Sequence, residues 1–229
     1  KSIFQYYKNS IPKFEEGIKT EIGKYRYFST VNITDEYRKY YRIFKKKKKL
    51  ILDVNKLAKN KKYYDLSSIH PSRDHRFIAY GEDINGRREF SIIIKDIDKN
   101  KILERNLCTS TGNIIWNKES NGYFYLKKDP KTLITNSLYF HRIGEQAKKD
   151  KLIYKESDRQ FNLSISLSRT KKYIFLQISK TESNETWYLN LDNEIDGLKL
   201  FYKRKNNHLY YVDDTPENFF ILSNRKNKK

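Results

Sequence analysis

A unit of four short strands recurs along this chain, and the recurrence constrains the fold more than any other feature of the sequence. Four aromatic residues begin apolar runs at spacings of 46, 50 and 46 residues: Phe77, Tyr123, Tyr173 and Phe219. Five positions before each of them stands a residue that closes the preceding strand: Ser72, Lys118, Ser168 and Asp214. The pattern predicts a strand, a turn and a second strand in every unit.

The strands that follow these aromatic runs keep the same period. A third strand is expected in FSIIIKDID, SLYFHRIG and TWYLNLD, with Ile97, Ile143 and Leu191 in register. A fourth, shorter strand is expected in RNLCT, KLIYKE and KLFYKR. The segments YRYFST, YYRIF and LILDV supply three strands of an earlier unit. Helical periodicity is nearly absent, and only residues 11–23 could form a short helix or a linker.

Four-stranded units at intervals of about 40 to 50 residues are typical of a β-propeller, in which each unit is one blade. An evenly spaced sandwich is the alternative, but the shared register of four aromatics argues against it. We therefore expect an all-β chain that forms a partial β-propeller of about four blades. Residues 1–23 are predicted as a linker or short helical lead-in and residues 24–229 as the partial propeller. The predicted blades lie near residues 24–55, 63–107, 112–156 and 161–204, with the start of another at 208–229.

The net charge of +20, with a pI of about 9.7, is the strongest signal in the composition. Such a charge favours a polyanionic partner. Lys and Asn are spread along the whole length with Ile and Tyr, however, which favours a general compositional bias over a nucleic-acid-binding surface. The one dense run, Lys45–Lys49, lies between two strand-like segments and is expected to be a solvated turn.

The cysteine count and the hydropathy of the chain bear on where the protein works. A single cysteine, Cys108, cannot form an internal disulfide, which indicates a reducing compartment, and we expect a cytoplasmic protein. No run approaches the roughly 20 apolar residues that span a bilayer, so no membrane partner is expected. The chain has no methionine, even at position 1, which suggests a piece of a longer protein.

A search for catalytic, metal-binding and phosphate-binding motifs gives no site. The eight glycines form no G-x-S-x-G nucleophile elbow. No C-x-x-C, H-E-x-x-H or glycine-rich phosphate loop occurs. The segment Ser168–Lys171 fits S-x-x-K but occupies a predicted turn. The four histidines are expected in structural or solvated positions: His70, His75, His141 and His208. We expect no catalytic, cofactor-binding or metal-binding residue in this chain.

A weaker candidate site consists of acidic residues that could line a propeller channel and attract a basic peptide: Glu82, Asp83, Asp129, Glu156 and Asp158. Acidic residues at the corners of blades also terminate strands and stabilise turns, and we favour that interpretation. The tryptophans Trp116 and Trp187 fall on repeat strands, where packing between blades is the expected role.

Several segments, in this order and spacing, are similar to segments of a known family: ILDVNKLA, SRDHRFIAYGEDINGRREFSIIIKDID, HRIG, LIYKESDRQF and FILSNRKNKK. Together with Trp116, Phe124, Tyr125 and Asp129 they span about residues 20–229. The chain resembles the propeller of the prolyl oligopeptidase family of serine peptidases, and within it the oligopeptidase B, or protease II, branch. It departs from the pattern at Arg73, where the family usually has the proline of a Ser-Pro-Asp turn, and in its high basic charge.

The resemblance implies a serine peptidase in which a seven-bladed propeller caps an α/β-hydrolase domain and filters short peptides cleaved after Lys or Arg. The catalytic domain would lie mainly after the propeller, so its Ser-Asp-His triad would be absent from this chain. We expect the chain to be inactive alone, with the missing hydrolase portion as its partner, in the same chain or in another. The alternative is a self-standing module that binds a protein or a nucleic acid through its basic surface.

Overall fold

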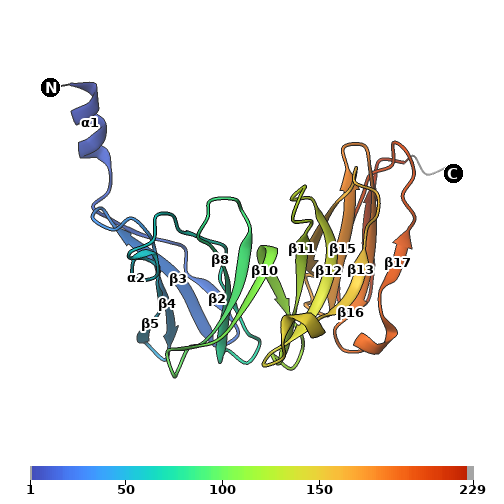
Figure 1. Cartoon of the computed structure of the whole chain (residues 1–229), viewed down its shortest axis with the longest axis horizontal. Coiled ribbons are helices and arrows are strands. Elements are labelled where there is room, and N and C mark those ends of the chain that lie inside the picture. The colour runs from blue at the N-terminus through green and yellow to red at the C-terminus, as the bar shows by residue number, and fades with distance from the viewer. Residues whose placement is uncertain (1, 226–229) are drawn as a thin grey trace. The chain divides into compact units, whose positions relative to one another are not determined.

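The computed structural model describes residues 2–225 and contains mainly antiparallel strands (Figure 1). The chain divides into two compact units between Tyr64 and Asp65. The expected all-β class is confirmed. No helix among residues 2–225 is long and apolar enough to cross a membrane.

The first unit is one antiparallel sheet with two short helices. Its elements are α1 (Ile3–Ser10), β1 (Phe14–Glu16), β2 (Thr20–Ile22), β3 (Tyr25–Asn32), β4 (Lys39–Phe44), β5 (Lys47–Asp53) and α2 (Val54–Ala58). The strand order is β1–β3–β4–β5, and β2 also pairs with β3. The three strands expected from YRYFST, YYRIF and LILDV are therefore present as β3, β4 and β5.

The N-terminal segment differs from the expectation of a helix or linker within residues 11–23. The helix lies earlier, at α1, where the Ser2 hydroxyl caps it by accepting the Gln5 N–H at 3.3 Å. Residues 11–23 instead contain β1 and β2, which pair with opposite ends of β3. The long edge of β3 offers unpaired backbone groups, and these two short strands satisfy them more completely than a helix with Pro12 and Gly17 could.

The second unit contains three sheets. Its strands are β6 (Asp65–Leu66), β7 (His70–Pro71), β8 (Phe77–Asp83), β9 (Phe90–Asp96), β10 (Lys101–Trp116), β11 (Gly122–Lys128), β12 (Thr135–Arg142), β13 (Lys151–Lys155), β14 (Asn162–Leu167), β15 (Tyr173–Lys180), β16 (Ser183–Asn190), β17 (Lys199–Tyr202), β18 (Tyr210–Asp214) and β19 (Phe219–Ser223). The 3₁₀ helices η1 (Ala147–Lys149) and η2 (Glu194–Asp196) lie in loops. The sheets run from β6 to β13, from β14 to β17, and from β18 to β19.

Strand β10 is longer than expected because it serves two of the predicted units. It pairs with β9 between Lys101 and Ser110, and with β11 between Ser110 and Trp116. The buried Ser110 hydroxyl donates to the Phe90 carbonyl at 2.7 Å and accepts the Gly112 N–H at 3.0 Å. Gly112 has a φ of +81°, which a larger residue adopts at a cost. The chain therefore changes partner through a bulge, and the segments RNLCT and NIIWNK form one continuous strand.

The turn between the first two strands of a unit repeats with the same backbone hydrogen bond. In three pairs the N–H of the first residue donates to the carbonyl of the second: Ser72 and Phe77, Asn117 and Gly122, Ser168 and Tyr173. The aromatic spacing predicts Lys118 for the middle turn, which is wrong by one residue. Strand β11 begins at Gly122, so its first aromatic comes one position late.

Two apolar cores lie on opposite sides of β11. Tyr123 and Tyr125 belong to a buried cluster with residues of β8, β9 and β10. Phe124 and Leu126 belong to a second cluster with residues of β14, β15 and β16. Because side chains alternate along a strand, one strand supplies both cores. Sheets buried on both faces are what successive blades require.

Candidate functional site

The four histidines lie in separate environments. His70 lies in β7, and burial lowers its pKa, an effect that a hydrogen bond with Asn113 opposes. His75 occupies a turn with a φ of +60°. His141 is buried between the carboxylates of Glu104 and Asp150.

His208 comes nearest to a catalytic pair. Its Nε2 lies 3.0 Å from the Ser223 hydroxyl oxygen. Its Nδ1, however, is buried without a hydrogen-bond partner among residues 2–225, so no carboxylate orients the ring. A serine triad needs that third group. The pair therefore lacks the geometry of a hydrolase site.

Ser168 of the S-x-x-K segment is part of a buried turn. Its hydroxyl accepts the Tyr173 N–H at 3.1 Å and donates to Asp214 Oδ2 at 2.9 Å. Both interactions link strand ends, and the second joins residues 46 positions apart. This is a structural turn rather than the environment of an activated nucleophile.

Three of the five acidic candidates close turns. Asp83 accepts the N–H groups of Asn85 and Arg88 at 2.8 and 2.7 Å. Asp129 accepts two backbone N–H groups of its own turn, which lower its pKa. Asp158 accepts the Gln160 N–H at 3.0 Å.

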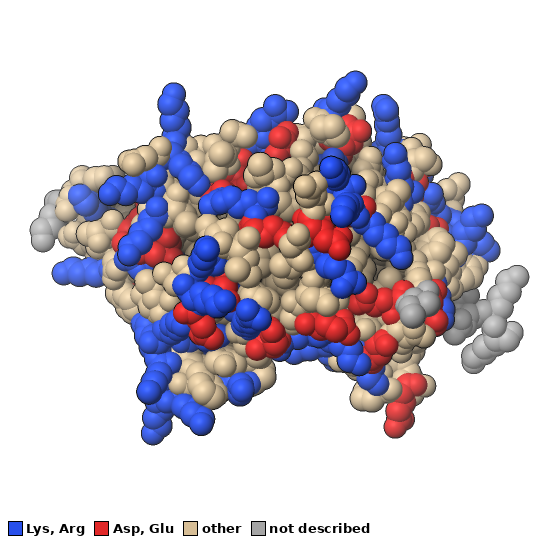
Figure 2. Space-filling view, turned by 60° about the horizontal axis from the view of Figure 1, so that its bottom comes forward, with Lys and Arg blue, Asp and Glu red and all other residues tan. Residues whose placement is uncertain are grey.

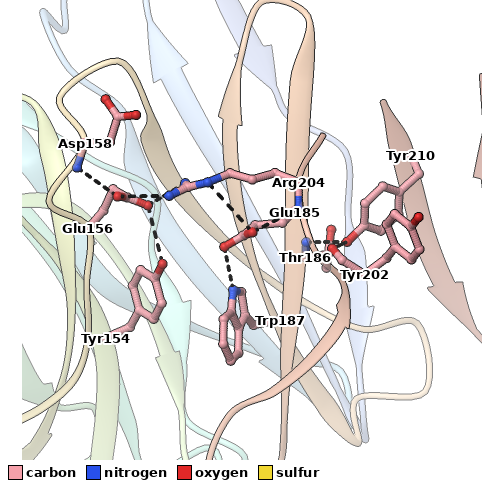
Figure 3. Close-up of polar contacts among 9 residues, drawn as sticks. All are labelled: Tyr154, Glu156, Asp158, Glu185, Thr186, Trp187, Tyr202, Arg204 and Tyr210. Carbon is pink, nitrogen blue, oxygen red and sulfur yellow. Dashed lines mark hydrogen bonds and ion pairs between the residues drawn. The ribbon is translucent and has the colours of Figure 1, made fainter. Parts of the chain in front are cut away.

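The other two acidic candidates form ion pairs. Glu82 lies 2.9 Å from Arg105. Glu156 lies 2.6 Å from Arg204 and belongs to a larger cluster, which is drawn in Figure 3. Of the five acidic candidates, Glu156 therefore has the most extensive set of polar contacts.

The cluster holds one guanidinium between two buried carboxylates. Arg204 donates to both carboxylate oxygens of Glu156, at 2.6 and 3.3 Å, and its Nε lies 3.9 Å from Glu185 (Figure 3). The side chains of Glu156 and Glu185 are 3% and 6% exposed. Their buried negative charges are therefore compensated by the positive charge of Arg204. The guanidinium also lies 4.1 Å from the centroid of the Phe161 ring.

Neighbouring groups complete the hydrogen bonding of the two carboxylates. The Trp187 indole donates to Glu185 at 3.0 Å, and the Asp158 N–H donates to Glu156 at 2.9 Å. Burial alone would raise the pKa of Glu156, but the hydrogen bonds from Arg204 and the Asp158 N–H outweigh it and lower the pKa. Glu156 therefore stays ionised. The two carboxylates hold the guanidinium of Arg204, and an ionised Glu156 is not suited to proton transfer at neutral pH.

Sequence reasoning missed Glu185 and Arg204. The only available signal is spacing, because Glu156 and Arg204 lie 48 residues apart, close to the repeat period. The cluster joins the end of β13 to β16 and to the loop after β17, and so connects two neighbouring sheets. Among the described residues no group of three or more His, Cys, Asp or Glu side chains could hold a metal ion.

The surface charge is mixed on the face drawn in Figure 2. Lys and Arg side chains extend from all parts of this face, and Asp and Glu side chains lie between them. The basic charge is therefore dispersed there and does not form one continuous patch.

Comparisons with known proteins identify the family. A family model described as "Prolyl oligopeptidase, N-terminal beta-propeller domain" matches residues 1–229. Protease 2 of Moraxella lacunata is 26% identical over 232 residues, which covers 97% of this chain and 34% of that protein. Dipeptidyl aminopeptidase BI of Pseudoxanthomonas mexicana is 35% identical over 136 residues, which covers 59% of this chain and 19% of that protein. The chain thus spans about a third of the relatives' length or less.

A solved structure shares the fold over almost the whole chain. Oligopeptidase B from Leishmania major superposes with a TM-score of 0.91 at 24% identity, covering 97% of this chain and 32% of that one. The predicted partial β-propeller and the predicted likeness to oligopeptidase B are confirmed. The chain belongs to the prolyl oligopeptidase family, as its N-terminal β-propeller domain.

Proposed function

We propose that this chain is the lid of a serine peptidase similar to oligopeptidase B. The lid admits short peptides to an α/β-hydrolase portion, which cleaves them after Lys or Arg. The observation that carries the proposal is the match of the family model to residues 1–229. The hydrolase portion would be supplied by further residues of the same chain or by a partner chain.

The described residues support a lid rather than a complete enzyme. Within residues 2–225 the histidines lack the serine and carboxylate arrangement of a triad, and the Glu156–Arg204–Glu185 cluster connects two neighbouring sheets. We also propose the predicted blade limits, near residues 24–55, 63–107, 112–156, 161–204 and 208–229, as the units of this lid. Each such unit would bury its faces against its neighbours.

The preference for Lys and Arg rests on the likeness to Protease 2 and oligopeptidase B. A size filter follows from the lid, because a substrate must pass the propeller to reach an enclosed active site. Both features belong to the complete peptidase.

The test compares the chain alone with the chain expressed together with an α/β-hydrolase portion of the same family, fused to it or as a separate chain. We expect a fluorogenic Arg-Arg substrate to be cleaved only in the second case, and a matched Gly-Pro substrate to be cleaved poorly. A folded protein of about 100 residues should resist cleavage. Hydrolysis by the chain alone, or equal cleavage of the large protein, would contradict the proposal.

A further inference from the structure

A pocket of about 360 Å³ lies between two neighbouring sheets of the second unit. Strands β11, β12 and β13 supply one wall, and Leu189 of β16 and Glu194 of η2 supply the other. This volume is within the range of about 300–1,000 Å³ that small-ligand sites occupy. None of the residues that line the pocket belongs to the Glu156–Arg204–Glu185 cluster.

The floor of the pocket is apolar because of strand alternation. Phe124 and Phe140 are register partners on β11 and β12, with ring centroids 4.8 Å apart. Ile153 on β13 and the buried Leu189 continue the apolar surface. The floor can accept the aliphatic or aromatic part of a ligand.

The rim of the pocket carries three cations without an ion pair in the described part of the chain, although Arg142 and Lys151 lie near enough to Glu194 to lower its pKa. Arg142 follows Phe140 by two residues on β12, and Lys151 precedes Ile153 by two on β13, so each lies on the pocket side of its strand. Lys149 of η1 joins them. Among residues 2–225 none of these three cations forms an ion pair with a carboxylate. Three exposed cations over an apolar floor favour a ligand that carries a carboxylate.

A carboxylate on the same rim restricts that ligand further. Glu194 Oε1 is buried without a hydrogen-bond partner among the described residues. Burial and the nearby Glu119 raise the pKa of Glu194, although Arg142 opposes them. A buried oxygen without a partner is costly. Glu194 also lines the pocket, so a cationic ligand group there would pair with its carboxylate. Glu145 adds a second carboxylate to the lining.

We propose that this pocket binds the carboxyl-terminal end of a short peptide whose last residue is Lys or Arg. This choice of ligand rests on the proposed function, because cleavage after Lys or Arg releases such ends. The terminal carboxylate contacts Arg142 and Lys151, the basic side chain reaches Glu194, and its methylene groups pack on Phe124 and Phe140. The pocket is a product-binding site on the propeller.

The test measures binding of the dipeptide Phe-Arg to the 229-residue chain tethered at low density for surface plasmon resonance, so that association between copies does not interfere. Two analogues each remove one feature: Phe-Arg amide lacks the carboxylate, and Phe-norleucine lacks the basic group. We expect each analogue to bind about tenfold more weakly or worse, as the loss of one charged contact predicts.

Variants assign those differences to residues. The double variant Arg142→Gln, Lys151→Gln should abolish the difference between Phe-Arg and its amide. Glu194→Gln should abolish the difference between Phe-Arg and Phe-norleucine. Exposed residues outside the pocket provide matched controls, Arg159→Gln with Lys203→Gln and Glu182→Gln, which should leave both differences intact. Circular dichroism is used to check that each variant folds.

Three results would overturn the proposal: no binding of Phe-Arg to the folded chain, equal binding of all three dipeptides, or differences that survive in the pocket variants. Inorganic sulfate that competes as well as Phe-Arg would equally overturn it, because it would show a plain anion site. The measurement needs no catalysis. Failure here leaves the peptidase assignment standing, and failure of the hydrolysis test leaves any measured dipeptide binding standing.

Discussion

His141 is a buried histidine whose surroundings favour the charged form. Its side chain is 1% exposed, with Nδ1 2.6 Å from Asp150 and Nε2 2.8 Å from Glu104. Burial by itself lowers the pKa of His141, but the interactions with the two carboxylates raise it above the ordinary value of 6.5. Glu104 lies on β10 and His141 on β12, so the charged ring links these two strands of the same sheet.

The charge on His141 makes stability depend on pH in a defined direction. A histidine whose pKa is higher in the folded protein than in the unfolded chain stabilises the fold below pH 6.5. That contribution is lost as the pH rises through the raised pKa. We therefore expect the melting temperature of wild type to exceed that of His141→Gln by the largest margin at about pH 5.5, and the margin to shrink towards about pH 8.5.

His70 provides a control with the opposite sign. Burial lowers its pKa, so its contribution is present above pH 6.5 and is lost as the pH falls through the lowered value. The margin between wild type and His70→Gln should therefore grow with pH in the same melting series. Parallel pH profiles for the two variants would contradict both assignments.

At the scale of elements, the sequence predicted the repeat well because aromatic and branched residues mark each central strand. It did not predict that β10 would run through Ser110 without a turn, because a serine and a glycine at a bulge resemble the composition of a loop. It also missed β1 and β2, which are too short to show periodicity and form only because β3 offers them an edge.

The candidate site was predictable only in part. Glu156 could be singled out as an acidic residue at a strand end, which is a local property. Its partners Arg204 and Glu185 lie on other segments of the chain, and their contact depends on how two sheets pack. No pattern within a short stretch of sequence predicts how two sheets pack. The pocket between β11–β13 and β16 was unpredictable for the same reason.

The Glu156–Arg204–Glu185 cluster connects two sheets, so replacing its one cation should have a large effect on the free energy of unfolding. Arg204→Met should destabilise the fold by about 3–5 kcal/mol, because it leaves two buried carboxylates without their cation. Chemical denaturation measures this free energy. The control Lys203→Met changes an exposed neighbour and should have little effect.

A rescue experiment separates the loss of charge balance from the loss of packing. If uncompensated charge is the cause, adding Glu156→Gln and Glu185→Gln to Arg204→Met should recover a substantial part of the lost stability. If the guanidinium acts mainly by packing on Phe161, the added substitutions should give no recovery.

At the scale of the whole molecule, β18 and β19 form a two-stranded sheet with an open and mainly apolar face. Tyr211, Phe220 and Leu222 are 59%, 60% and 74% exposed. Tyr211 and Leu222 are register partners, and Phe220 lies two residues from Leu222, so the three share this face. Phe219, on the other face, packs on Tyr173. Within residues 2–225, the outer edge of β19 has no partner strand.

An open apolar face beside an unpaired strand edge favours association with another chain. We expect the isolated 229-residue chain to form oligomers or aggregates as its concentration rises, measured by light scattering after size-exclusion chromatography. The double variant Phe220→Lys, Leu222→Lys should shift the chain towards monomer. The control Ser157→Lys, Asn206→Lys adds the same charge at exposed sites elsewhere and should not. A wild-type chain that stays monomeric and melts cooperatively at about 100 µM would show that this face is stable in water, and that the propeller domain is a self-sufficient module.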